Sequence, residues 1–356
     1  MNPRIDIYLD KLRSNTKVLV EKCNKYDISV TAVTKGFCGY PEIAHELVEA
    51  GVKYLADSRI ENLEKLQHFP VEKILLRLPM ISMAKEVIKY ADISLNSEIA
   101  TLRALDSAAA EANKLHKVIL MRDLGDLREG FFDEKDLIET VKEVINLRNI
   151  EIVGIGTNLT CYGGVIPTEK NLQILLDTAK MVEKLTGKPI EIISGGNSSS
   201  IYLIEEGRIP PGINNLRLGE SILLGGETTY GGKIKDCFID TFQLVAEIIE
   251  IKEKPSIPIG EIGLDAFGNV PSFEDKGMMK RAILAVGKQD LATHPITPTD
   301  DKVEILGGSS DHLIMDITHS DVDYKVGDEM KFLLGYGSML ALMTSSYVTK
   351  NFIKGN

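Results

Sequence analysis

The sequence predicts an α/β protein in which a (β/α)8 TIM-type barrel is followed by a smaller C-terminal all-β domain. Through the first two thirds of the chain, short β-branched runs alternate with longer segments that have the apolar spacing of amphipathic helices. Several of the short runs are apolar almost throughout, which is typical of parallel strands covered on both faces. In the last third, strand-like runs broken by glycine and proline replace the helical pattern.

Eight segments of the first part have the composition of buried strands, and eight strand–helix units are what a closed barrel needs. They are residues 29–34, 53–56, 73–78, 92–95, 117–121, 151–157, 190–194 and 215–218. Helical patterns lie between them, for example at residues 42–50, 98–116 and 168–185. A helix at residues 11–26 precedes the first strand and would be the eighth barrel helix, displaced to the front. On pattern alone, an open doubly wound sheet is the alternative.

The chain changes character in the glycine-rich stretch 225–232, which we take as the border between two domains. We therefore expect a barrel domain of residues 1–228 and a β domain of residues 229–356. The strand candidates of the second domain are residues 241–251, 282–286, 303–306, 313–317 and 330–334.

The composition excludes several classes of protein. The 356 residues include 41 Lys+Arg and 52 Asp+Glu, a formal net charge of −11, and 44% are hydrophobic. We expect a globular core and no nucleic-acid partner, because a general nucleic-acid binder needs a basic face. No run approaches the roughly 18 apolar residues of a membrane span, and the first residues lack a signal-peptide core, so no membrane association is expected. With four scattered cysteines and no CxxC pair, we expect a cytoplasmic protein with reduced thiols.

Active sites of such barrels lie at the carboxyl ends of the strands, and the first strand ends in Thr34, Lys35 and Gly36. A lysine that continues an apolar strand into the barrel mouth would be partly desolvated, which lowers its pKa and leaves a nucleophilic amine. Such an amine can form a Schiff base with a carbonyl substrate or with pyridoxal phosphate. The alternative is a lysine that reaches out to solvent from a strand end.

The ends of the seventh and eighth strands have the composition of a phosphate site. The sequence SGGNSSS occupies residues 194–200, and Gly219, Glu220 and Ser221 follow the eighth strand. Small residues and hydroxyls at a helix start present N–H groups to an anion, and barrel phosphate sites are often built from these two loops. An ordinary capped turn is the alternative.

Arg217 alternates with two leucines on the eighth strand, so we expect its side chain to point into the barrel mouth. A buried guanidinium needs a partner, which could be a cofactor ring nitrogen or a structural carboxylate. On the same rim, polar glycine-rich segments follow the fifth strand at residues 123–130 and the sixth at residues 158–164.

Six segments bring these residues together in order, each at a predicted strand end or in the β domain. They are VTAVTKGFCGY at 30–40, DLGDLREG at 123–130, GIGTNLTCYGG at 154–164, SGGNSS at 194–199, NNLRLGES at 214–221 and GGSSDHLIMD at 307–316. Together they resemble the alanine racemase family of pyridoxal 5′-phosphate enzymes, and within it the ornithine racemase branch. The resemblance covers nearly the whole chain. It implies an isomerase that racemises an amino acid through Cα proton transfer and acts as a head-to-tail homodimer.

The resemblance also assigns roles to residues of this chain. Lys35 matches the catalytic lysine that holds the cofactor. Arg217 matches the arginine that faces the pyridine nitrogen, and Arg128 matches the one that orients the cofactor oxygen and the substrate carboxylate. The remaining cofactor contacts would come from Asn158, Asn197, Ser198, Gly219, Glu220 and Tyr336.

The chain departs from the family pattern in three places. Gly39 stands where the family has a tyrosine, and Asn158 stands where it has a histidine. The tyrosine that carries a proton on the face of Cα opposite the lysine is missing from residues 263–268, and Asp265 is the proposed catalytic substitute, with His312 as an alternative. None of the six histidines has metal-ligand spacing, so no metal is expected.

These departures bear on the substrate. A carboxylate could hold a distal ammonium group by a charge-assisted hydrogen bond, for which an alanine pocket would have no use. The candidates are Asp311 beside Ser310, Glu220 and Asp265. With the resemblance, they favour ornithine, or lysine, over alanine, unless these acids bond to the protein itself. Two other interpretations are considered. One is a non-catalytic pyridoxal-phosphate homeostasis protein, which generally lacks the β domain. The other is a decarboxylase or aldolase on the same barrel.

Overall fold

The computed structural model describes residues 2–265, 267–291 and 294–355 and divides the chain into two compact units. The barrel unit is Asp10–Phe238, and the sheet unit consists of Met1–Leu9 and Ile239–Asn356. This division falls after the glycine-rich stretch because the next residues pack on the barrel: Ile234 is fully buried. The side chain of Asn15 also exchanges two hydrogen bonds, of 2.7 and 2.8 Å, with the backbone of Phe238.

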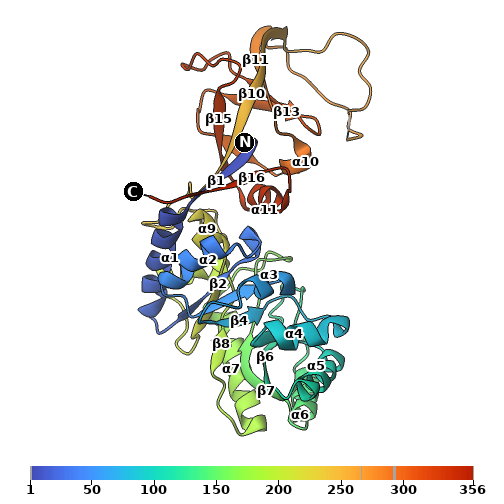
Figure 1. The fold of residues 1–356 in the computed structure, drawn as a ribbon. Coiled ribbons are helices and arrows are strands. Elements are labelled where there is room, and N and C mark those ends of the chain that lie inside the picture. Colours follow the sequence, from blue (N-terminus) through green and yellow to red (C-terminus); the bar gives the residue numbers. More distant parts are fainter. Residues whose placement is uncertain (1, 266, 292–293, 356) are drawn as a thin grey trace. The chain divides into compact units, whose positions relative to one another are not determined.

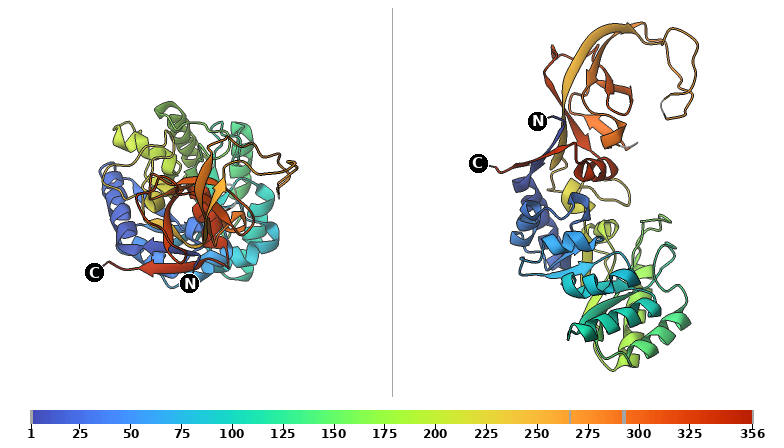
Figure 2. Two further views of the ribbon diagram at one scale, coloured as in Figure 1. Left: turned by 90° about the horizontal axis from the view of Figure 1, so that it is seen from above. Right: turned by 45° about the vertical axis from the view of Figure 1, so that its right-hand side comes forward.

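Eight parallel strands close the barrel in chain order (Figure 1), which confirms the predicted fold class. They are β2 (Ser29–Val33), β3 (Tyr54–Asp57), β4 (Glu72–Leu75), β5 (Ile93–Asn96), β6 (His116–Met121), β7 (Ile150–Gly156), β8 (Ile192–Ser194) and β9 (Asn215–Leu218). Each overlaps one of the eight predicted strands. The helices are α1 (Leu9–Asn24), α2 (Pro41–Glu49), α3 (Ile60–Lys65), α4 (Ala84–Tyr90), α5 (Ile99–Glu111), α6 (Glu134–Val144), α7 (Glu169–Thr186), α8 (Ile201–Glu205) and α9 (Glu220–Leu224). Seen from above, the helices of the barrel unit form a ring (Figure 2).

One predicted helix was too long. The expected helix at residues 98–116 ends at Glu111, because Asn113 adopts a positive φ of 51° and His116 already belongs to β6. A left-handed residue ends an α-helix, and asparagine is among the residues that tolerate this conformation best.

The interior of the barrel has an apolar part and a polar part. Side chains of β3 to β8 form a buried cluster that includes Ile74, Leu95 and Ile119. Near β2, β8 and β9, by contrast, the Ser194 hydroxyl donates to Asn215 Oδ1 (2.7 Å), and Asn215 Nδ2 donates to Thr31 Oγ1 (2.8 Å). Buried polar groups that are fully hydrogen-bonded fix a unique packing. The polar part lies beneath the strand ends that carry the expected phosphate site.

The sheet unit is built on an antiparallel sheet in the order β12-β15-β10-β11-β14-β13, which confirms the predicted second part of the fold. Its elements are β1 (Arg4–Tyr8), β10 (Phe242–Pro255), β11 (Met278–Leu284), α10 (Lys288–Leu291), β12 (Ile296–Pro298), β13 (Glu304–Gly308), β14 (Leu313–Asp316), β15 (Glu329–Leu334), α11 (Tyr336–Thr344) and β16 (Thr349–Ile353). The sequence did not predict β1, which pairs with β10 and with β16. In the part of the chain that is described, no helix combines the length and apolarity needed to cross a bilayer.

His116 makes the stability of the barrel unit dependent on pH. Its ring is buried and its Nε2 lies 2.8 Å from the Ser94 hydroxyl. Burial, with a smaller contribution from the Lys114 charge, lowers the pKa of His116 to about 4 from its ordinary 6.5. Between these pH values the unfolded chain binds a proton that the folded chain does not, so stability falls as the pH falls from 6.5 towards 4.

We expect His116→Gln, which keeps a partner for Ser94, to remove this part of the pH dependence, worth about 3 kcal/mol over the full range. Urea unfolding of the cofactor-free chain at pH 7 and pH 5 measures it. His45→Gln, on the exposed face of α2, serves as the control. The same loss of stability on acidification in wild type and His116→Gln would contradict the assignment.

Candidate active site

Lys35 is separated from the end of β2 by one residue and begins a single 3-10 turn, Lys35–Phe37. The preceding Thr34 is buried, and its backbone N–H continues the sheet by donating to the Ala56 carbonyl at 2.8 Å. Lys35 therefore stands at the carboxyl end of a barrel strand, as predicted. Its side chain is exposed, however, so the expected desolvation by the strand end is not seen in the chain as described. The position of this amine is set by its loop rather than by burial of its side chain.

Asp57, at the end of β3, fixes that loop and was missed by the sequence analysis. Its carboxylate is fully buried and accepts hydrogen bonds from the Thr34 hydroxyl (2.5 Å), the Arg59 N–H (2.8 Å) and Asn62 Nδ2 (3.2 Å). Burial raises the pKa of Asp57, although these donors oppose the shift. The sequence did contain a signal for Asp57, which directly follows a predicted strand. The carboxyl ends of all barrel strands lie on one rim, so an acid at this place is expected near the site.

The same loop explains one departure from the family pattern. Gly39 has a φ of +61°, and a Cβ built on it would lie 2.9 Å from Cβ of Asn62. A tyrosine at this position would be strained and would clash with α3, so glycine is required by the packing.

The loops after β8 and β9 meet, as predicted for a phosphate site. The Ser198 hydroxyl accepts from the N–H groups of Gly219 (3.3 Å) and Ser221 (3.1 Å) and lies 3.0 Å from the Ser221 hydroxyl. Asn197 caps the turn by accepting from Ser199 N–H (2.8 Å). Glu220 is half-buried at the start of α9, and burial raises its pKa.

Two buried hydroxyls at this end of the barrel fit an anionic ligand. Ser199 Oγ and Thr157 Oγ1 have no hydrogen-bond partner among the described residues. Buried polar atoms without a partner are rare, and a bound ligand is one way to complete them. Together with the Ser198 loop, they suit a phosphate group, which accepts hydrogen bonds from hydroxyl and N–H donors.

Arg217 crosses the mouth of the barrel from β9 to β7. Nη1 donates to the Ser194 hydroxyl (2.5 Å), and Nη2 donates to the Thr157 carbonyl (2.6 Å) and Asn158 Oδ1 (3.0 Å). Gly156 lies beside this guanidinium, and a Cβ built there would be 3.4 Å from Nη1. Burial lowers the pKa of Arg217 to about 10, so it is still charged at neutral pH. The side chain points into the mouth, as expected, and the described residues include no carboxylate in direct contact with it.

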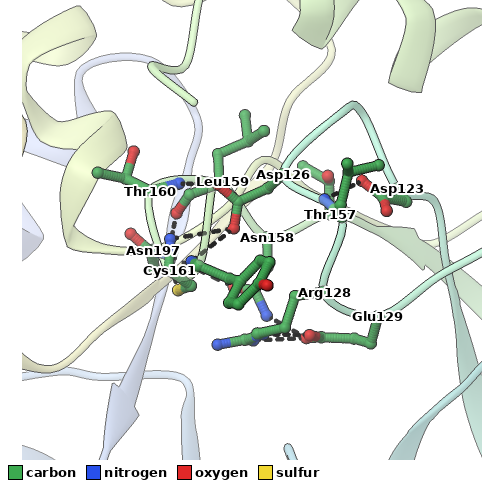
Figure 3. Close-up of polar contacts among 12 residues, drawn as sticks. Asp123, Asp126, Arg128, Glu129, Thr157, Asn158, Leu159, Thr160, Cys161 and Asn197 are labelled. Carbon is green, nitrogen blue, oxygen red and sulfur yellow. Dashed lines mark hydrogen bonds and ion pairs between the residues drawn. The ribbon is translucent and has the colours of Figure 1, made fainter. Parts of the chain in front are cut away.

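A carboxylate ties the loop after β6 to the loop after β7 (Figure 3). Asp126 is almost fully buried and accepts four backbone hydrogen bonds of 2.9 to 3.1 Å. The donors are the N–H groups of Thr160, Cys161, Tyr162 and Val165. Burial acts to raise the pKa of Asp126, but these N–H donors together hold it below its ordinary value. We name this contact the Asp126 clamp. The sequence analysis missed it.

The clamp holds the two loops that carry Arg128 and Asn158. Arg128 forms an ion pair with the adjacent Glu129, and Asn158 Nδ2 donates to the same carboxylate at 2.5 Å. Asn197 joins this group from the loop after β8 by donating to the Leu159 carbonyl (2.9 Å).

The structure gathers the predicted residues of the barrel unit at the carboxyl ends of five strands. Those residues are Lys35, Arg128, Asn158, Asn197, Ser198, Arg217, Gly219 and Glu220. The other four belong to the sheet unit. Tyr336 begins α11, Ser310 donates to Asp311 (2.9 Å), and Asp265 accepts from the N–H groups of Phe267 and Asn269 (2.9 and 2.8 Å). In the described residues, no group of three or more His, Cys, Asp or Glu side chains is placed to hold a metal ion.

Comparison with known proteins assigns this barrel, with its strand-end lysine and hydroxyl-rich loop, to a family. The alanine racemase N-terminal domain matches residues 7–226, and the chain belongs to this family. The predicted resemblance is confirmed. Over 353 residues the chain is 53% identical to an ornithine racemase of Acetoanaerobium sticklandii, covering 99% of this chain and 100% of that protein. It is 43% identical over 350 residues to a lysine racemase of Thermotoga maritima, covering 98% of both proteins.

Solved structures show the same fold. The alanine racemase of a D-cycloserine-producing Streptomyces lavendulae superimposes with a TM-score of 0.77 at 18% identity, covering 100% of this chain and 98% of that one. The Bartonella henselae alanine racemase with covalently bound pyridoxal phosphate gives a TM-score of 0.75 at 18% identity, covering 99% of this chain and 100% of that one. At these identities the likeness concerns the fold alone.

Proposed function

We propose that the protein is a pyridoxal-phosphate-dependent racemase that interconverts L- and D-ornithine. The choice of ornithine as the substrate rests on the 53% identity to an ornithine racemase across 99% of the chain. The cofactor is supported by the family and by the site: a lysine at a barrel strand end, a hydroxyl-rich loop with unpartnered buried hydroxyls, and an arginine across the mouth.

The predicted site residues of the barrel unit have separate parts in this chemistry. Pyridoxal phosphate, when bound, acidifies the Cα–H bond by drawing the developing negative charge into its ring. The Lys35 amine removes the proton from one face of Cα in one direction of the reaction and delivers a proton to that face in the other direction. Arg217, a donor that cannot accept a proton, would keep the ring nitrogen unprotonated, which would favour return of the proton to Cα. Ser198 and the backbone of Gly219 and Glu220 would hold the phosphate.

Racemisation needs a second proton carrier on the opposite face of Cα. We assign this role to Asp265 of the sheet unit, and we assign a phosphate contact to Tyr336. The N–H groups of Asn269 and Phe267 hold the pKa of Asp265 below its ordinary value, which makes this carboxylate a weaker base in the described arrangement. Arg128 holds the substrate carboxylate by paired hydrogen bonds.

The enzyme is proposed to act in the cytoplasm as a homodimer in which a second copy covers the barrel mouth. Large apolar side chains are exposed on the rim of the barrel, such as Leu127 and Tyr162 (77% exposed). The connection between β10 and β11 in the sheet unit exposes others, including Ile259 (92%), Leu264 and Val270. Exposed apolar surfaces of this kind mark interaction sites, and a covered mouth would exclude water from the reaction.

The distal ammonium of ornithine requires an acidic partner. Glu220, Asp311 and Asp265 are the proposed candidates, with Ser310 supporting Asp311. Of these, Glu220 lies in the barrel unit and is half-buried. Lysine is the second candidate substrate, because the lysine racemase is 43% identical over nearly the whole chain and its substrate differs by one methylene.

The deciding experiment is deuterium exchange at Cα in D2O, followed by NMR and chiral chromatography. The wild-type protein with added pyridoxal phosphate is offered L-ornithine, L-lysine and L-alanine. We expect exchange and D-isomer formation with ornithine at the highest kcat/KM, weaker turnover of lysine, and little of alanine. A bound cofactor without exchange on any of the three would contradict the proposal and favour a cofactor-binding protein.

A further inference from the structure

Glu129 is a carboxylate at the barrel mouth for which the proposed reaction gives no role. One of its oxygens accepts from Arg128 Nε, and the other accepts from Arg128 Nη2 (2.5 Å) and Asn158 Nδ2 (2.5 Å). Only 14% of the Glu129 side chain is exposed, against 38% for Arg128. A shielded carboxylate with three charge-assisted or amide donors constrains its partners far more than an exposed surface pair does.

Asn158 extends this contact to a second arginine. Its Nδ2 faces Glu129, and its Oδ1 accepts from Arg217 Nη2 at 3.0 Å. A carboxylate only accepts and a guanidinium only donates, so a single orientation of the Asn158 amide satisfies both. Figure 3 shows Arg128 and Asn158 both directed at the Glu129 carboxylate. The four side chains therefore form one continuous chain of donors and acceptors across the mouth.

The charges favour the same arrangement. Arg217 is buried and hydrogen-bonds to neutral groups. The negative charge of Glu129 acts to raise the pKa of Arg217 and so favours the protonated guanidinium. Burial acts to raise the pKa of Glu129, but the hydrogen bonds and charge of Arg128, with help from Asn158 and Arg217, hold it below its ordinary value. Glu129 is thus ionised at neutral pH and compensates two cations.

We propose that Glu129 is a positioning residue that sets both arginines of the reaction at once. It holds Arg128 directly, at the substrate carboxylate, and it holds Arg217 through the Asn158 amide, at the cofactor ring. This inference rests on the proposed function. Loss of the carboxylate should therefore weaken the binding of substrate and of cofactor together.

The test compares Glu129→Gln and Glu129→Asp with Glu169→Gln in the full-length protein. Glu169 is the matched control, because its carboxylate also accepts two hydrogen bonds from one arginine, Arg208 (3.2 and 2.7 Å), but on the exposed surface of the barrel unit. Three quantities are measured: the apparent Kd for pyridoxal phosphate by absorbance titration of the cofactor-free protein, KM and kcat for ornithine, and the melting temperature.

We expect Glu129→Gln to raise the cofactor Kd and the ornithine KM each by about tenfold, the effect of losing one charged hydrogen bond. Glu129→Asp keeps the charge one methylene further back and should show smaller increases. If Glu129→Gln does not fold, the same measurements on Glu129→Asp test the proposal. Glu169→Gln should leave both constants unchanged.

Two outcomes would overturn the inference: a cofactor Kd and KM within about twofold of wild type in Glu129→Gln, or equal losses in both Glu129 variants that follow a drop in melting temperature. Failure of the proposed function has a different signature. Wild type would then not turn over ornithine, and the cofactor Kd of the variants would still decide the role of Glu129.

Discussion

Lys35→Ala is expected to lose Cα exchange of ornithine by at least about a thousandfold, the upper part of the range for a general base. The variant should fold normally, because the side chain of Lys35 is exposed and its removal leaves no cavity. Deuterium exchange at Cα measures the loss. The covalent link to the cofactor is measured separately, as the mass added to wild type, but not to Lys35→Ala, after borohydride treatment in the presence of pyridoxal phosphate.

Lys65→Ala provides the matched control for this experiment. Lys65 is a second exposed lysine beside the same loop, where Nζ donates to the Cys38 carbonyl at 3.0 Å. Its removal should leave exchange close to that of wild type. Methylamine in the buffer should restore part of the activity of Lys35→Ala. Exchange above a tenth of the wild-type rate in Lys35→Ala without added amine would rule out Lys35 as the base.

Asp126→Asn is expected to have the second largest effect, on stability and activity together. Each oxygen of the Asp126 clamp accepts two backbone N–H groups, so an amide NH2 in place of either oxygen leaves two part-buried N–H donors without an acceptor. We expect the free energy of unfolding to fall by about 3 kcal/mol, because each unsatisfied donor costs roughly 1 to 3 kcal/mol. The loops that carry Arg128 and Asn158 should lose their fixed positions, and KM for ornithine should rise by about tenfold or more.

Asp133→Asn tests whether the effect belongs to the clamp. Asp133 lies in the same connection and accepts one N–H, from Lys135 at 2.8 Å, as the N-cap of α6. Asparagine is as good an N-cap as aspartate, so this variant should stay within about 0.5 kcal/mol of wild type. Urea unfolding of the two variants makes the comparison. Equal stability of Asp126→Asn and Asp133→Asn would show that the clamp does not hold the loops.

The barrel could be predicted from the sequence because its strands are covered on both faces and read as apolar runs. The glycine-rich ends after β8 and β9 were recognisable for a similar local reason, since hydroxyls and small residues cluster there within a few positions. β1 could not be predicted in this way. RIDIY is a short alternating segment whose partner in β10 lies more than two hundred positions away.

The interactions that organise the site were harder to predict than its residues. Asp126 binds backbone N–H groups, which every residue has, so nothing in the sequence of its partners marks the contact. Glu129 reads as one more charged residue in a loop until the structure shows its two partners. The exposure of Lys35 also differed from the expectation, because a strand-end rule locates a residue along the chain and does not determine which neighbours cover it.

The pairing of β1 with β16 has a consequence for how the protein is made. Asn351 Nδ2 donates to Asp6 Oδ1 at 2.7 Å, across a separation of 345 positions. On the ribosome, the first strand emerges long before the strands that flank it, while the barrel unit is translated in one continuous stretch. The barrel can therefore complete its core first, and the sheet closes around β1 only when the last strand has been synthesised.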